Sequence, residues 1–194
     1  MFRLTIALLV VVSVLAMAGV ASAGSVHLAG GKNAKPAFND GGTTLTATVD
    51  VAGLGNFNTE LNITANGTAT GTSTCSNNGG NAAPGQNPAA FPVTATGSTA
   101  VPSSDIKNGR VQISVTSITS PLTFTTAGAP DCANPNWTET VTITDVAWTS
   151  ATLTLKQDTD NDGFYTDESA ALSAACTFSP ATSNGPVPAA NVSC

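Results

Sequence analysis

Two loop segments decide how this chain folds, TCSNNGGN (74–81) and APDCANPNW (129–137). Both are rich in Gly, Pro and Asn, the residues that mark turns and loops. The residues between them alternate polar and apolar side chains, the period-two pattern of a half-buried strand. A bond between Cys75 and Cys132 would therefore pin distant parts of a β-sheet protein together.

The same alternation recurs along most of the chain. Leu45 to Val51 alternates without a break, and no segment after the N-terminus has the period of a helix. Further strands are expected at 61–74, 91–95, 111–115, 122–124, 141–146, 153–155 and 172–178, with a short first strand at 25–28. Near Asp145 the apolar phase shifts by one residue, which predicts a β-bulge. We expect seven to nine strands at spacings of about ten residues.

This pattern predicts an all-β protein built as an antiparallel β-sandwich with immunoglobulin-like, Greek-key connections. A β-barrel is the structural alternative, because short strands with regular turns suit either architecture.

The N-terminus has the features of an export signal. Arg3 supplies a positive charge, residues 4–20 are almost wholly apolar, and residues 21–23 read Ala-Ser-Ala, an A-x-A cleavage site. We therefore predict a signal peptide at 1–23 and a single domain at 24–194, of 194 − 23 = 171 residues. No later apolar run is long enough for a membrane span. The predicted location is secreted or extracellular.

Charge and cysteine content narrow the function classes. Removing Arg3 leaves 5 basic and 12 acidic residues, a net charge of 5 − 12 = −7. An acidic chain disfavours nucleic acid and anionic membranes as partners. Four cysteines without a C-x-x-C motif predict two disulfides in an exported protein, not a zinc site. Loop context and proximity along the chain favour Cys75–Cys132 and Cys176–Cys194.

Several motifs resemble those of a group of small exported bacterial proteins that are uncharacterised. They are CSNNGGN (75–81), PGQN (84–87), IKNG (106–109), PDC (130–132), NWT (136–138) and CTFSP (176–180). The resemblance covers nearly the whole mature chain. It implies a secreted β-fold with paired cysteines, and it implies no activity, substrate or catalytic residue.

The sharpest chemical motif is DTDNDGFYTDE (158–168). Aspartates at the first, third and fifth positions, followed by Gly, match the start of a calcium loop, because alternate carboxylates converge on one hard cation. The predicted ligands are Asp158, Asp160, Asp162, the Phe164 carbonyl, and Asp167 or Glu168.

The motif departs from the EF-hand pattern. Its twelfth position is Ser169 instead of a bidentate Glu, and its flanks are predicted strands. We therefore expect a calcium loop carried on a hairpin, with a plain acidic turn as the alternative. Five of the 12 acidic residues lie here, and a bound cation would relieve their repulsion.

The sequence contains few residues that could form a catalytic site. His27 is the only histidine, and no Gly-x-Ser-x-Gly elbow accompanies it. Paired carboxylates for glycoside cleavage form only on folding, so a secreted hydrolase stays a third hypothesis. Trp137 in a loop is a candidate sugar platform, whereas Trp148 in a strand is expected in the core.

The first functional hypothesis is thus an exported non-enzymatic protein that acts through binding or surface structure. The second is a calcium-dependent module that binds carbohydrate or protein, based on the Asp158 loop and Trp137. The partner of either is an unknown protein or glycan.

Overall fold

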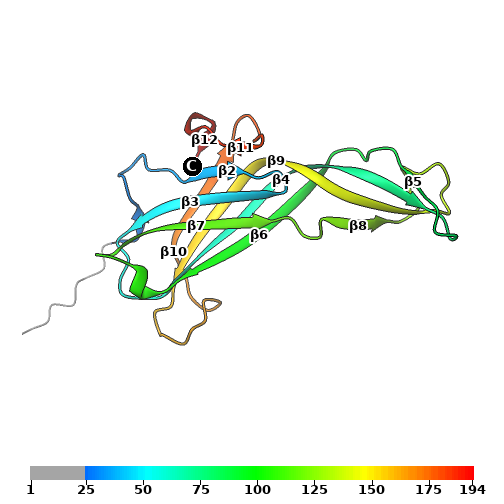
Figure 1. Cartoon of the computed structure of the whole chain (residues 1–194). Helices are drawn as coiled ribbons and strands as arrows, with labels where there is room; N and C mark the ends of the chain where they lie inside the picture. Colours follow the sequence, from blue (N-terminus) through cyan, green and yellow to red (C-terminus); the bar gives the residue numbers. More distant parts are fainter. Residues whose placement is uncertain (1–24) are drawn as a thin grey trace, which may run out of the picture.

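The computed structural model describes residues 25–194, and it is all-β and antiparallel, as predicted (Figure 1). The predicted signal peptide at 1–23 lies outside the described residues. The elements in chain order are β1 (His27–Leu28), β2 (Ala37–Asp40), β3 (Thr44–Ala52), β4 (Thr59–Ser76), β5 (Ala82–Pro84), β6 (Phe91–Val101), η1 (Ser103–Asp105), β7 (Arg110–Ile118), β8 (Thr123–Thr126), β9 (Thr138–Gln157), β10 (Ala170–Phe178), β11 (Gly185–Pro186), η2 (Ala189–Asn191) and β12 (Val192–Ser193).

The strands form one curled sheet in the order β11-β2-β3-β7-β6-β4-β9-β10-β12, with β1, β5 and β8 attached at its sides. Twelve strands exceed the predicted seven to nine because β1, β2, β5, β11 and β12 are only two to four residues long. A single curled sheet is compatible with the barrel alternative. The immunoglobulin-like sandwich stays a prediction.

The two longest strands give the molecule its elongated shape. β4 and β9 pair along their whole lengths, from Thr59↔Gln157 to Ser76↔Thr138. Figure 1 shows their far halves leaving the body together with β5 and β8. We call this extension the arm and the remaining sheet the body.

Bulges interrupt the β4–β9 pairing at two places. The register shifts between Asn66 and Gly67 and again between Thr70 and Gly71 on β4. The second shift lies opposite Asp145, which confirms the predicted bulge. A Cβ on Gly71 would lie 2.5 Å from the Thr142 carbonyl oxygen, so the strands approach too closely there for a side chain.

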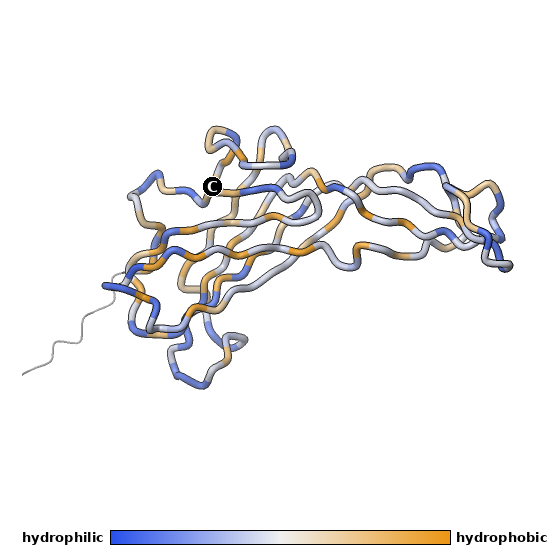
Figure 2. The backbone as a smooth tube through the Cα atoms, viewed as in Figure 1, coloured by the Kyte–Doolittle hydropathy of each residue, from blue (hydrophilic) through white to orange (hydrophobic). Residues whose placement is uncertain are grey.

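The core lies inside the body and follows the predicted alternation. Trp148 is fully buried at its centre, as expected for a strand tryptophan. Figure 2 shows apolar residues spaced along the body strands and hydrophilic residues in the loops. The largest fully buried apolar side chains around Trp148 are Leu45, Val51, Leu61, Ile63, Ile113, Val115, Val146 and Leu155.

The structure contains both predicted disulfides. Cys75 bonds Cys132 at the end of the arm, and Cys176 bonds Cys194 beside β12. The segment after β10 crosses between the two edges of the sheet, because β11 pairs with β2 and β12 pairs with β10. The second disulfide therefore holds the segment that bridges the two edges.

Across residues 25–194, no helix has the length and apolar character needed to cross a membrane.

Candidate functional site

The acidic motif forms the loop between β9 and β10, at the opposite end of β9 from the arm (Figure 1). Its flanks are paired antiparallel strands, as predicted for a loop on a hairpin. The Asp158 amide donates a hydrogen bond to the Asn58 carbonyl oxygen at 2.9 Å. This bond fixes the start of the loop against the chain that enters β4.

Three carboxylates of the loop converge. One oxygen from each of Asp158, Asp160 and Asp162 lies within 4.8 Å of the other two. The turn that gathers them is held by Asp158, whose Oδ1 and Oδ2 accept hydrogen bonds from the amides of Asp162 at 3.1 Å and Gly163 at 3.2 Å. Gly163 has φ of 86°, a conformation that favours glycine. The Asp-x-Asp-x-Asp-Gly spacing is therefore needed for this geometry.

The three carboxylates differ in exposure. Asp158 is only 1% exposed, whereas Asp160 and Asp162 face solvent. Each Asp158 oxygen accepts one amide hydrogen and retains a second lone pair. The loop therefore offers carboxylate oxygens from one buried residue, Asp158, and from two exposed residues, Asp160 and Asp162. Carboxylate oxygens are the ligands that calcium prefers.

Neighbouring charges act on Asp160. The hydrogen bond from the Asp162 amide favours the ionised form of Asp160, but burial and the charges of Asp162, Asp167 and Glu168 together outweigh it and raise the Asp160 pKa. Like charges close together disfavour ionisation. A cation at this position would reverse that effect.

The remaining predicted ligands lie outside the convergent group. Glu168 accepts hydrogen bonds from the Thr159 amide at 2.5 Å and the Thr159 hydroxyl at 2.8 Å, and these bonds lower its pKa. Asp167 is exposed. Glu168 therefore ties the end of the loop to its beginning in this structure.

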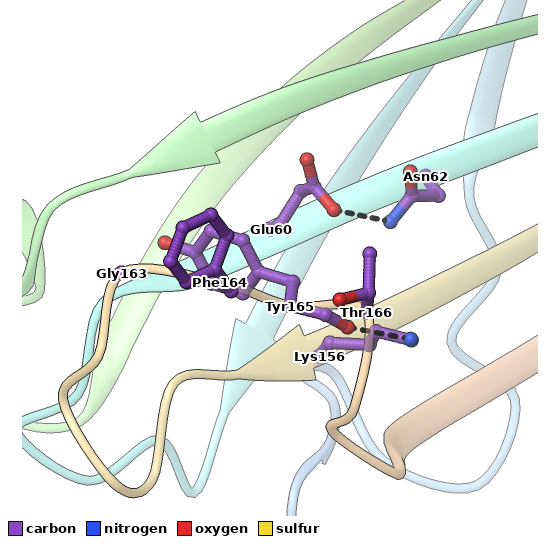
Figure 3. A pocket seen from close by; sticks show the side chains of 7 residues that line it. All are labelled: Glu60, Asn62, Lys156, Gly163, Phe164, Tyr165 and Thr166. Atoms are coloured by element: carbon purple, nitrogen blue, oxygen red, sulfur yellow. Dashed lines mark hydrogen bonds between the residues drawn. The ribbon is translucent and has the colours of Figure 1, made fainter.

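Phe164 adjoins the carboxylates through its backbone. Its amide donates to Asp162 Oδ1 at 2.7 Å, while its ring is 64% exposed. The ring points to a pocket of about 330 Å³ beside the loop (Figure 3). The pocket is lined by Glu60, Asn62, Lys156, Gly163, Phe164, Tyr165 and Thr166.

Contacts within the pocket hold its walls in place. Asn62 Nδ2 donates to Glu60 Oε2 at 2.9 Å on β4, and Lys156 Nζ on β9 donates to the Tyr165 carbonyl oxygen at 2.6 Å (Figure 3). Burial, followed by the charges of Asp158 and Glu60, raises the Tyr165 pKa. The aromatic part of the loop is thus tied to the outer face of β9.

The sequence pattern does not predict this pocket. Glu60 and Asn62 fall on the polar phase of β4, where the alternation indicates only solvent exposure. The available signal was Phe164, a large apolar residue at the tip of an acidic loop. Nothing in the sequence placed residues 60–62 beside residues 164–166.

The other candidate residues lie elsewhere. Trp137 precedes β9 and the acidic loop follows it, so they are separated by a strand of 20 residues, or roughly 60 Å. The structure therefore separates Trp137 from Asp158, which the second hypothesis had combined. His27 is exposed in β1, with its Nδ1 2.6 Å from the Ser25 carbonyl oxygen.

A pair of carboxyl groups does form on folding, but inside the arm. Glu139 is fully buried and accepts a hydrogen bond from Ser73 Oγ at 2.8 Å. Burial, followed by the Glu139 charge and a hydrogen bond with Glu139, raises the pKa of Asp131. Glu139 has no solvent-accessible surface, whereas Asp131 is half-buried, so only one carboxyl group of this pair reaches the surface in the described structure.

Comparisons with known proteins return no family model that matches, no curated protein that matches and no solved structure that matches significantly.

Proposed function

We propose that this chain is an exported, non-enzymatic protein that acts by binding an extracellular ligand at the loop 158–169. Two disulfides suit an oxidising compartment, because cytosolic thiols are normally kept reduced. The A-x-A motif at 21–23 supports export. The loop extends from the body, between the paired strands β9 and β10.

Calcium is the proposed cofactor of this loop. The observation that carries the proposal is the convergence of Asp158, Asp160 and Asp162 within 4.8 Å, on a backbone turn that Asp158 itself holds. Asp167 is proposed as an additional ligand. Glu168 would have to leave Thr159 to take the same role, so we rank it second.

The immunoglobulin-like sandwich belongs to this proposal as its scaffold. β6 and β7 share only the register pair Thr96↔Ile118, which is a short connection within the sheet. This short connection would allow the sheet to divide there into two layers that pack face to face, as in a sandwich. The barrel is the alternative scaffold.

Calorimetric titration of the exported chain with calcium tests the proposal. An extracellular-type site with a dissociation constant of about 10⁻⁴ M would, at about 1 mM calcium, stabilise the fold by about 1.4 kcal/mol. For a domain of this size, that corresponds to a rise in melting temperature of about 3–6 °C. No heat and no thermal shift up to several millimolar calcium would show the loop to be a plain acidic turn.

A further inference from the structure

We propose that the pocket beside the acidic loop binds a neutral sugar ring, with Phe164 as its stacking platform. This inference deepens the proposed binding function, since it names the ligand class for the same loop. The pocket volume of about 330 Å³ lies at the low end of ligand pockets, which span about 300–1,000 Å³. A shallow site of this size suits a single ring of a glycan better than a folded partner.

The exposure of Phe164 has no explanation in the packing of the core. At 64% it is the most exposed large apolar side chain among residues 25–194. Its backbone is nevertheless fixed, because the Phe164 amide donates to Asp162 Oδ1 and Lys156 holds the next carbonyl. A rigid, exposed aromatic face loses little entropy when it stacks on the apolar face of a sugar.

The polar side of the pocket offers free acceptors. Asn62 Nδ2 donates to Glu60 Oε2, which leaves Asn62 Oδ1 and Glu60 Oε1 without a partner in the hydrogen bonds of the described residues. Both belong to β4, two residues apart on its outer face. Sugar hydroxyls are suitable donors to such an amide and carboxylate pair, since each hydroxyl donates and accepts.

The charge of the pocket favours a neutral ligand. Glu60 and Lys156 are directly opposed register partners on β4 and β9, so one acid and one base line the same wall. The neighbouring carboxylates of Asp158, Asp160 and Asp162 disfavour an anionic ligand. A basic peptide would have to approach Lys156, so a neutral glycan is the better match.

Binding to an array of neutral oligosaccharides tests the inference. The exported chain is applied at about 1 mM calcium and again with chelator, and the best-retained glycan is then titrated by calorimetry. Phe164→Ala and Asn62→Ala are each expected to lower its affinity about tenfold or more, because each removes a principal contact. Phe164→Tyr keeps the ring and should keep the affinity.

Leu122→Ala is the matched control, since Leu122 is also exposed, at 42%, and lies outside the pocket. Its glycan affinity should equal that of the unchanged chain. A blank array in both calcium and chelator overturns the inference, and so does a glycan whose binding survives Phe164→Ala.

The calcium proposal and the sugar inference fail separately. Calcium heat with a blank array leaves the metal site in place and overturns the sugar site. Glycan binding that needs Phe164, in a chain that shows neither heat nor a thermal shift with calcium, supports the sugar site and contradicts the metal site.

Discussion

Thr182 Oγ1 donates a hydrogen bond to Asp40 Oδ2 at 2.5 Å, across 142 residues of sequence. The same hydroxyl accepts a hydrogen bond from the Trp148 amide at 2.9 Å. The other oxygen of the Asp40 carboxylate, Oδ1, accepts a hydrogen bond from the Gly42 amide at 2.8 Å. Asp40 and Thr182 are 3% and 9% exposed. One hydroxyl therefore connects β2, the centre of β9 and the segment that bridges the sheet edges.

Replacing Thr182 with Val should lower the free energy of unfolding by about 3 kcal/mol, because a buried carboxylate oxygen and a buried amide both lose a partner. Urea denaturation measures the loss. Thr152→Val is the control, since Thr152 is an exposed residue of β9, and its effect should stay within about 0.5 kcal/mol. Equal stability for the two variants would contradict the bridging role of Thr182.

Gly97→Ala should destabilise the joint between β6 and β7. A Cβ at this position would lie 1.9 Å from the Thr116 carbonyl oxygen, so the two strands must separate to admit it. We expect a loss of about 1–3 kcal/mol by thermal or urea unfolding, typical of overpacking. The neighbouring exposed Ser98→Ala change should be close to neutral, and a neutral Gly97→Ala would show that this joint is loose.

Removing either disulfide should lower the free energy of unfolding, and the region that becomes more mobile should depend on which disulfide is removed. Replacing Cys176 and Cys194 with Ala opens a loop of 18 residues, and replacing Cys75 and Cys132 opens one of 57. Chain entropy predicts losses of about 3 and about 4 kcal/mol, respectively. Hydrogen exchange should then increase at residues 180–194 for the first pair and in the arm for the second, and the reverse pattern would contradict this assignment.

The stabilisation by calcium should depend on pH through Asp160. Its pKa is raised in the folded chain, so the fold holds this proton more tightly than the unfolded chain does. Without calcium, the free energy of unfolding should therefore decrease as the pH rises through the raised pKa of Asp160, and it should increase again as the pH falls. Because calcium competes with the proton, the thermal shift it causes should be full near pH 7 and shrink towards about pH 4.

The substitution Asp160→Asn removes the negative charge of this side chain but keeps its shape. The amide oxygen can still accept the Asp162 amide, which lies 3.3 Å from Asp160 Oδ1. Without calcium near neutral pH, this variant should melt at the same temperature as the unchanged chain or slightly higher, because repulsion is removed. With calcium its thermal shift should be smaller than that of the unchanged chain, because a neutral amide oxygen attracts the cation less than a carboxylate does, and an undiminished shift would show that the charge of Asp160 does not contribute to binding.

Local patterns determined much of this structure. Alternation of apolar residues predicts the strands because side chains of a strand point to opposite faces, and burial along β3 and β4 follows that period. Loop context predicted both cysteine pairs. The Asp-x-Asp-x-Asp-Gly spacing predicted the converging carboxylates, because that convergence depends only on a local backbone turn.

Tertiary structure alone decided the rest. The curled single sheet, the arm and the Thr182 bridge depend on which strands pair, and pairing partners far apart in sequence leave no local pattern. Asn39 and Asp40 precede a Gly-Gly pair, a pattern typical of turns, yet they pair with β3 as part of β2. The pocket has the same origin: Glu60 and Asn62 meet Phe164 because β4 and β9 are register partners, and no property of either segment by itself determines that contact.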